Sequence, residues 1–319
     1  MQQENTQVFN EAQQTWVTRS LNFIPPFLTR PEYLYNRSQI GRRIWHQLYK
    51  GNPVEEVMLP WGAPIFIGPD DLIGDAIWKM GVFDLIVAEA LMRLTDPGEL
   101  ALDVGANIGV MSSVLAGAVG PKGRVISFEP LPSLVTKFRE NVDLWRDRLG
   151  WSQVSVVPTA LSSEEGEAVL TMPTGFAANR GIATLETGLP GEKITIATAT
   201  LDASLASDEF VGTMKIDVEG HEHSVLQGSD ELLSTGRIRD IVFEENNEYP
   251  SAATSVLESH GYKIFGLKKG LLGPQLIAPT VSKKSGETPN YLATRDPSRA
   301  IERLTATGWC AYKKKEPPR

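Results

Sequence analysis

The stretch Leu100–Ala116 constrains the fold most strongly, because it is typical of a strand, a glycine loop and a helix in immediate succession. Leu100–Val104 is a short apolar run with a single acid, which predicts a strand buried on both faces of a parallel sheet. Gly105 and Gly109 then allow a sharp turn and a close approach to a ligand or the next helix, and Asn107 tolerates the left-handed backbone region. The free N–H groups of the following helix face this loop and favour electron-rich ligand groups.

A second short apolar run, Arg124–Phe128, ends in Glu129 and Pro130. Glu129 follows Gly109 by 20 positions, where the next parallel strand of a βαβ unit ends and an acid can accept hydrogen bonds from both ribose hydroxyls. The pattern is not the dinucleotide fingerprint, because the middle glycine is missing and Asp103 would repel a pyrophosphate. A ligand with a cationic or amine-bearing tail fits better.

A third parallel-type strand begins at Val211 and ends in Asp217. Open α/β sheets bind ligands at the carboxyl ends of their strands, so Asp103, Glu129 and Asp217 are expected to converge on one rim. Such convergence of acids is unfavourable unless they bind something cationic or hydroxylated.

The histidines His221 and His223 raise the question of a metal site. Positions two apart diverge by about 200° on a helix, and the spacing does not match that of zinc proteases. We therefore expect no metal. His221 remains open as a general base, a polar site residue or a histidine with no chemical role.

Together these motifs resemble the FkbM-type family of class I S-adenosylmethionine-dependent methyltransferases. The resemblance rests on Asp103–Gly109, Phe128–Pro130 and Lys215–Glu222, and it covers about residues 75–295. It implies an α/β fold with a Rossmann-like, doubly wound sheet of seven mostly parallel strands, the last of which, at Asn290–Thr294, is antiparallel. It also implies S-adenosylmethionine as cofactor and S-adenosylhomocysteine as product.

The resemblance extends the site beyond the three acids. In similar enzymes the loop after the strand Val154–Val157 lines the adenine, which makes Ala160 and Leu161 candidate contacts. The expected cofactor-binding residues are Asp103, Gly105, Asn107, Gly109, Glu129, Pro130, Ala160, Leu161 and Asp217.

The family also suggests residues for the chemistry. Asp217 is expected near the methyl-transfer centre, and a Phe-Glu pair closes the substrate side of the pocket in relatives, which makes Glu244 a candidate base. His221, Asp217 and Glu244 are therefore the candidate catalytic residues, in no fixed order. Many relatives have a histidine after these acids, whereas this chain has Glu245–Asn247, so the substrate stays open.

The rest of the chain divides into three parts around this site. Residues 1–74 are expected to form a helical and β-hairpin extension, with the hairpin at Val54–Ile67, that acts as a cap, a substrate lid or a dimer arm. Residues 75–295 form the methyltransferase domain, beginning with a helix that Gly81 interrupts. Residues 267–289 are expected to be an irregular insertion, and residues 296–319 a tail.

Whole-chain properties limit the function classes. The net charge of −8 and the absence of a basic stripe argue against a nucleic-acid partner. The single cysteine, Cys310, fits a reducing compartment. No uncharged apolar run approaches the roughly 20 residues of a spanning helix. We therefore expect a soluble cytoplasmic protein without membrane contact, and a homodimer stays among the alternatives.

The most favoured function is O-methylation of a hydroxyl on a small metabolite such as a sugar or polyketide. Removing a hydroxyl proton needs a base within hydrogen-bond reach, and His221, Asp217 and Glu244 are the three candidates for it. The alternatives are a nicotinamide-dependent oxidoreductase and a non-catalytic protein that has kept the fold. The sequence does not name the acceptor atom or molecule.

Overall fold

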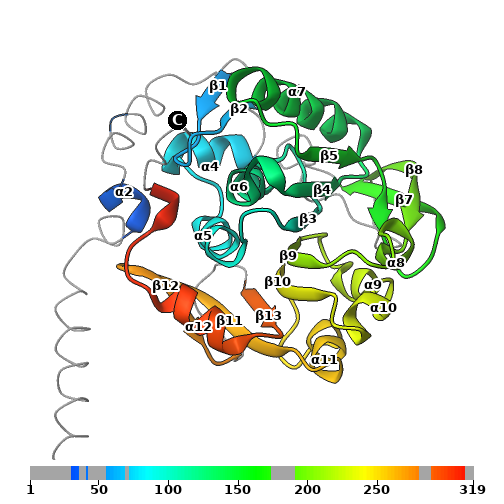
Figure 1. Cartoon of the computed structure of the whole chain (residues 1–319). Helices are drawn as coiled ribbons and strands as arrows, with labels where there is room; N and C mark the ends of the chain where they lie inside the picture. Colours follow the sequence, from blue (N-terminus) through cyan, green and yellow to red (C-terminus); the bar gives the residue numbers. More distant parts are fainter. Residues whose placement is uncertain are drawn as a thin grey trace, which may run out of the picture.

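A computed structural model gives the arrangement of the chain, and it describes residues 30–35, 41, 55–68, 72–173, 191–279 and 289–312. The predicted helices of the N-terminal extension lie mostly outside these residues. Within the described residues no helix has the length and apolar character that crossing a bilayer requires. The remaining parts surround one central sheet (Figure 1).

The central sheet has eight described strands in the order β12-β11-β13-β10-β9-β3-β4-β5. Their bounds are β12 Gly273–Ile277, β11 Lys263–Gly270, β13 Asn290–Thr294, β10 Ile238–Glu244, β9 Val211–Ile216, β3 Leu100–Val104, β4 Arg124–Phe128 and β5 Val154–Val157. Strands β10, β9, β3, β4 and β5 are mutually parallel, and β13 runs antiparallel to both of its neighbours. The predicted mostly parallel sheet with an antiparallel last strand is confirmed.

Strand β12 departs from the prediction. Residues 267–289 were expected to be irregular, but β11 continues to Gly270 and forms a hairpin with β12, which adds an eighth strand at the edge. The turn between them uses Gly273, whose φ of 143° lies outside the range that most residues adopt. The sequence did not predict this hairpin, because the paired ends of β11 and β12 are rich in Lys and Gly and show little apolar alternation.

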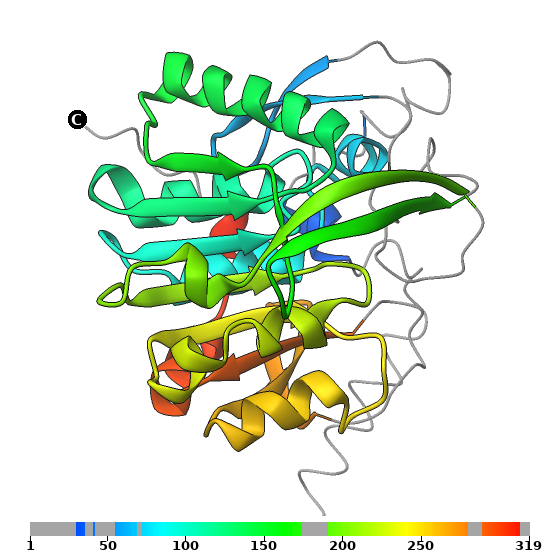
Figure 2. The same ribbon diagram turned by 90° about the vertical axis from the view of Figure 1, so that its right-hand side faces the viewer.

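Helices cover both faces of the sheet, as the doubly wound prediction requires (Figures 1 and 2). One face carries α5 Leu85–Leu94, α6 Val110–Val119 and α7 Pro132–Leu149, and the other carries α9 Glu222–Gln227, α10 Asp230–Ser234 and α11 Ala252–Ser259. Successive strand residues join opposite cores: Val242 packs in the first and Phe243 in the second. This alternation follows from the two-residue period of a strand.

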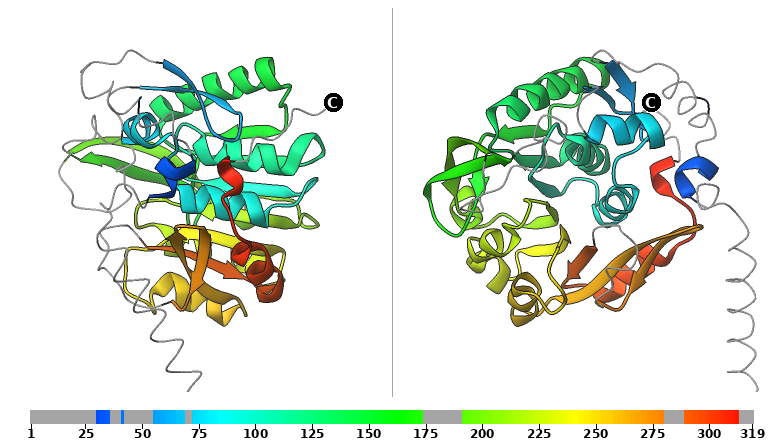
Figure 3. Two further views of the ribbon diagram at one scale, coloured as in Figure 1. Left: turned by 90° about the vertical axis from the view of Figure 1, so that its left-hand side faces the viewer. Right: turned by 180° about the vertical axis from the view of Figure 1, so that it is seen from behind.

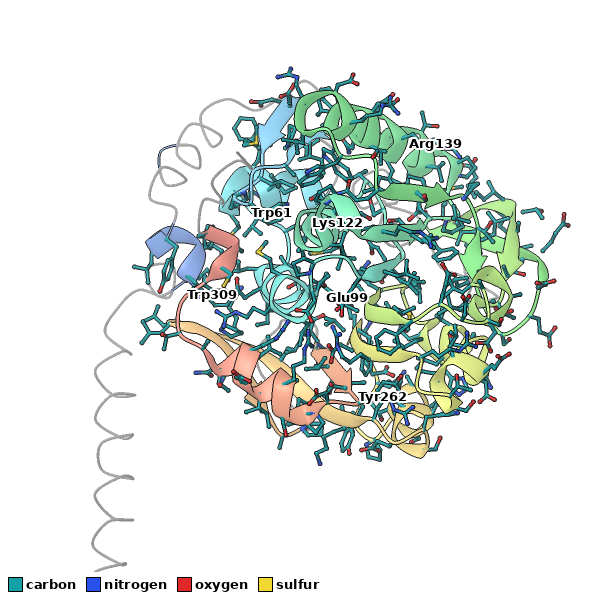
Figure 4. The ribbon with its side chains drawn as sticks, viewed as in Figure 1. Trp61, Glu99, Lys122, Arg139, Tyr262 and Trp309 are labelled. Carbon is teal, nitrogen blue, oxygen red and sulfur yellow. The ribbon has the colours of Figure 1, made fainter. Side chains whose placement is uncertain are left out.

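The predicted hairpin is present as β1 Glu55–Met58 and β2 Pro64–Ile67. Three hydrogen bonds of 2.6–2.9 Å attach it to α6 and α7. Trp61, labelled in Figure 4, donates from Nε1 to Ser113 Oγ at 2.9 Å, and Trp145 donates from Nε1 to the Pro64 carbonyl at 2.6 Å. The Phe66 N–H donates to Asn141 Oδ1 at 2.7 Å. The hairpin therefore packs as part of the domain, against α6 and α7.

A helix was expected from Asp75 to Leu94 with an interruption at Gly81, and the structure has two helices. Helix α4 spans Leu72–Met80, and α5 begins after Asp84. Gly81 has a φ of 78° and Asp84 a φ of 38°, so both lie in the left-handed region. The break directs the start of α5 toward the carboxyl edge of the sheet.

A small second sheet, in the order β6-β8-β7, projects beside the central sheet (Figure 2). It consists of β6 Ala160–Leu161, β7 Gly166–Pro173 and β8 Gly191–Ala199. The short helix α8, Leu201–Ser204, returns the chain to β9.

The C-terminal residues do not form a free tail as far as they are described. Helix α12, Pro297–Thr305, and the 3-10 turn Cys310–Tyr312 pack onto α5 (Figure 3). Trp309 is fully buried, and Glu89 accepts hydrogen bonds from the Cys310 and Ala311 N–H groups at 2.7 and 2.8 Å. Sequence reasoning missed this because the Cys310 and Ala311 N–H groups that bond to Glu89 lie more than 200 positions away, although its ion-pair partner Arg93 is in the same helix, at 2.6 Å.

Candidate functional site

Two adjoining cavities lie at the carboxyl edge of the parallel strands. The larger cavity encloses about 590 Å³, part of it open to solvent. Its lining residues are Val104, Gly105, Asn107, Phe128, Glu129, Pro130, Leu134, Thr159, Ala160, Leu161, Leu170, Asp217, Val218, Glu219 and His221. Eight predicted site residues are thus brought together in one place, although their exact roles stay predictions.

The glycine loop forms the floor of the larger cavity. Gly105 has a φ of 76°, and a Cβ on it would lie 1.9 Å from the Asp217 carbonyl oxygen, so the loop and the β9 end touch through bare backbone. The N–H groups of Gly105 and Ala106 both donate to the Phe128 carbonyl at 3.0 Å. Backbone contacts therefore join the carboxyl ends of β3, β4 and β9 at this point.

Gly109 was expected to allow close approach to a ligand or to a helix, and its surroundings favour the helix. A Cβ there would lie 2.3 Å from Phe138 Cε2, and Gly109 does not line either cavity. Its backbone, with a φ of 91°, starts α6 and lets α7 pack closely. The structure thus supports the predicted tight helix approach and gives no support for a ligand contact.

Glu129 faces the larger cavity at the end of β4. Its side chain is 6% exposed, and it accepts hydrogen bonds from the Asn107 and Leu131 N–H groups, each at 2.9 Å. Burial raises the pKa of Glu129 to about 7, against the lowering effect of those two bonds. The carboxylate is thus fixed in position and gains from any ligand group that donates hydrogen bonds to its charged form.

Asp103, like Gly109, is a predicted cofactor-binding residue that lies outside both cavities. It is fully buried and lines neither cavity. Its Oδ2 accepts from Ser112 Oγ at 2.5 Å, and its Oδ1 lies 3.3 Å from Lys215 Nζ. Asp103 therefore acts below the glycine loop, and the expected contact with a cofactor amine has no support.

Lys215 is a site residue that sequence reasoning missed. It is nearly buried, donates to the Gly105 carbonyl at 2.7 Å and lies 3.7 Å from Asp217 Oδ2. Burial lowers its pKa, but the charges of Asp103 and Asp217 outweigh this and hold the pKa above its usual value. A lysine within an otherwise apolar strand was the available signal, because a buried charge needs a partner.

The far wall of the larger cavity comes from the small sheet. Thr159, Ala160, Leu161 and Leu170 give it backbone groups and apolar surface. His221 lies beside this wall, with Nε2 at 2.9 Å from Ser162 Oγ, and burial lowers its pKa. His221 does not line the smaller cavity.

The smaller cavity encloses about 250 Å³ and shares Asp217 with the larger one. Its lining residues are Phe83, Asp84, Val87, Met111, Lys215, Ile216, Asp217, Val242, Phe243, Glu244 and Asn290. Burial, followed by the charges of Asp217, Glu219 and Asp84, raises the pKa of Glu244 to about 8. Of the three candidate bases, Asp217 and Glu244 face this cavity.

Backbone strain marks the same two cavities. Within the described ranges, three non-glycine residues have positive φ: Asp84 at 38°, Asn107 at 51° and Glu219 at 52°. Asp84 lines the smaller cavity, and the other two line the larger. Such conformations persist where the surrounding structure enforces them, and they concentrate at functional sites. Asp84 and Glu219 were not predicted as site residues.

No group of three or more His, Cys, Asp or Glu side chains suited to a metal ion occurs within the described part of the chain. His223 and His260 lie outside both cavities.

Comparison with known proteins identifies the family. The model of the methyltransferase FkbM domain matches residues 103–264, which is half of the chain. The chain belongs to the FkbM methyltransferase family. S-adenosylmethionine is therefore its cofactor.

Individual relatives of this FkbM methyltransferase are distant. The hexuronic acid methyltransferase AglP of Haloferax volcanii is 30% identical over 169 residues, which cover 50% of this chain and 63% of AglP. The AMB antimetabolite synthetase AmbE of Pseudomonas aeruginosa is 26% identical over 212 residues, which cover 53% of this chain and 10% of AmbE. The chain thus spans less than two thirds of the length of either relative.

Among solved structures, a methyltransferase FkbM of Methylobacillus flagellatus matches with a TM-score of 0.41 and 15% identity, and the match covers 70% of this chain and 61% of that one. A SAM-dependent O-methyltransferase of Thermotoga maritima matches with a TM-score of 0.39 and 14% identity over 85% of this chain and 83% of that one.

Proposed function

We propose that this FkbM methyltransferase transfers a methyl group to a hydroxyl of a small metabolite, such as a sugar, a polyketide or another natural product. The observation that carries the proposal is that the two cavities meet at Asp217, which lines both. The larger cavity is then the cofactor site and the smaller cavity the acceptor site. Transfer takes place where they meet.

The residues of the larger cavity fit the cofactor. Gly105, which packs on the Asp217 backbone with no room for a side chain, brings the loop to the cavity wall, and Glu129 is held by Asn107 where two ribose hydroxyls could donate to it. Thr159, Ala160 and Leu161 would line the adenine. When bound, S-adenosylmethionine supplies a methyl group already activated by its positive sulfur.

The residues near Asp217 suit a positive ligand. Burial and the charges of Asp217 and Glu222 raise the pKa of Glu219 to about 7, so this acid is poorly stabilised in the absence of a cation. A cationic ligand group beside Asp217 and Glu219 would favour their charged forms. The protein's main task is then to align the acceptor and exclude water.

Glu244 is the proposed base, with Asp217 beside it. Its raised pKa makes it more basic than an ordinary carboxylate, and it lines the smaller cavity, where an acceptor hydroxyl would lose its proton. His221 is assigned to the cofactor side, because it lies against Ser162 in the wall of the larger cavity.

The activity of a relative is consistent with this assignment. AglP, by its name, methylates a hexuronic acid, which is a small hydroxylated molecule. A homodimer and a cytoplasmic location stay predictions.

Two measurements test the proposal. Isothermal titration should show binding of S-adenosylhomocysteine and none of NAD; binding of NAD alone would favour the oxidoreductase alternative and remove the proposal. Incubation with S-adenosylmethionine and a library of hydroxylated metabolites should produce S-adenosylhomocysteine together with a product heavier by one methylene unit. Cofactor binding without transfer to any acceptor in the library would favour a non-catalytic protein.

A further inference from the structure

The smaller cavity has a wall built around Asp84, a residue without a predicted role. Asp84 lies at the start of α5 with a φ of 38°. Its Oδ1 accepts from the Val87 N–H at 3.3 Å, and its Oδ2 accepts from Asn290 Nδ2 at 3.1 Å. The side chain is thus held by a helix start and by a separate strand, and one carboxylate joins the two.

Asn290 connects Asp84 to the proposed base. It is the first residue of β13 and pairs in register with Glu244, the last residue of β10. Asp84, Asn290 and Glu244 therefore line one continuous wall that comes from α5, β13 and β10, elements that lie together in Figure 1. Two of the three carry carboxyl groups, and Asn290 adds an amide oxygen.

Lys215, which lines this cavity, is already paired with acids. Lys215 donates to the Gly105 carbonyl and lies between Asp103 and Asp217, at 3.3 and 3.7 Å from their oxygens. Lys269, whose charge reaches Asp84, makes an ion pair with Glu32 at 2.8 Å. In their ionised forms Asp84 and Glu244 therefore add negative charge to the described part of this wall.

The pKa values of Asp84 and Glu244 reflect the crowding of acids in this cavity. Burial raises the pKa of Asp84, and the nearby charge of Asp217 adds to the effect. Burial and the charges of neighbouring acids also raise the pKa of Glu244. A further carboxylate in this cavity would be repelled, whereas a hydroxyl or an ammonium would donate a hydrogen bond to Asp84.

We propose that Asp84, positioned by Asn290, is a specificity-determining residue that selects acceptors with a hydrogen-bond donor, a hydroxyl or an ammonium, next to the reacting oxygen and rejects acceptors with a carboxylate there. The proposal rests on the proposed methyl transfer to a hydroxyl. It separates this chain from its relative AglP, named for a hexuronic acid, and gives the substrate class as neutral or amino polyols.

The test compares three matched probes: the methyl glycosides of glucose, 6-amino-6-deoxyglucose and glucuronic acid. They share a ring and differ only at C6, which carries a neutral hydroxyl, a cationic ammonium or an anionic carboxylate. With saturating S-adenosylmethionine, release of S-adenosylhomocysteine should be at least about tenfold faster with the first two than with the glucuronide. A glucuronide that reacts as fast as the others, or no transfer to any of the three by a protein that binds S-adenosylhomocysteine, would overturn the proposal.

The variant Asp84→Asn tests the residue itself. Asparagine keeps the helix cap and tolerates the left-handed backbone. Its Nδ2 replaces the oxygen that accepts from Asn290, so the Asn290 amide must turn its oxygen toward position 84 to keep the hydrogen bond. We expect the preference for the neutral over the anionic probe to fall about tenfold through KM, with S-adenosylhomocysteine affinity in titration unchanged. The control Asp143→Asn, on the exposed surface of α7, should keep the parent preference. If Asp84→Asn keeps the parent preference, Asp84 does not select the acceptor. If the parent protein itself does not bind S-adenosylhomocysteine, the proposed function is wrong instead.

Discussion

Lys215 and Asp103 face each other across neighbouring parallel strands, with Nζ of the lysine 3.3 Å from Oδ1 of the aspartate. Both side chains are almost fully buried, and the lysine also donates to the Gly105 carbonyl at the tip of the glycine loop. The pair therefore lies directly beneath the site and couples the stability of the sheet to the shape of the loop.

We predict that Lys215→Met destabilises the protein by about 3–5 kcal/mol, because it leaves the charge of Asp103 buried without its cationic partner. Urea unfolding followed by circular dichroism measures the loss. The matched control Lys79→Met, which removes an exposed pair with Asp75, should change the free energy of unfolding by less than about 0.5 kcal/mol. Adding Asp103→Asn to Lys215→Met should recover part of the stability, and a double variant no more stable than the single one would contradict this account.

Gly105→Ala should abolish cofactor binding and destabilise the fold by more than about 3 kcal/mol, because its Cβ meets the Asp217 backbone at 1.9 Å in addition to the strain of a φ of 76°. Gly62 offers a comparison, since it has a φ of 91° and open space around it. Gly62→Ala should cost only the strain, about 1–2 kcal/mol, with cofactor affinity kept. Thermal unfolding and titration of both variants check the pair, and equal losses would show that contact with β9 is unimportant.

Cofactor affinity should rise with pH through the titration of Glu129. The folded-state pKa of about 7 lies above its ordinary value, so the side chain is protonated below that pH and charged above it. Ribose hydroxyls donate to the charged form, so binding releases a proton, and S-adenosylhomocysteine affinity should increase about tenfold from pH 6 to pH 8. Glu219 titrates in the same range in the same cavity, so Glu129→Gln assigns the effect. This variant should bind more weakly and with a flatter pH profile; an unchanged slope would assign the titration to Glu219.

The motifs that sequence reasoning placed correctly are local ones. The loop between Gly105 and Asn107, the acid at Glu129 and the hairpin before Ile67 each depend on a few consecutive residues, whose φ preferences and apolar patterns are visible in the chain. The parallel order then brings Glu129 and Asp217 together, because parallel strands end at one edge.

The features that sequence reasoning missed depend on distant partners. Asp84 became a site residue through Asn290, and Glu89 found its partners in Cys310 and Ala311. Asp103 carries the same lesson, since an acid at a strand end can face a ligand or, as here, lie beside a buried lysine. Only the register between β3 and β9 decides between them.

The assignment of the base can be decided by separating kcat from KM. Glu244 lines the smaller cavity and is protonated below its pKa of about 8, so the methyl-transfer rate should rise with pH and level off above about 8. Glu244→Gln should lower kcat about 100-fold or more, remove this rise and leave the KM for S-adenosylmethionine unchanged. His221→Ala should instead raise that KM several-fold with little loss of kcat, because His221 lies in the wall of the larger cavity against Ser162. His260→Ala provides a control, since that ring bonds to Asp230 away from both cavities. A large fall of kcat in His221→Ala at unchanged KM would transfer the role of base from Glu244 to His221.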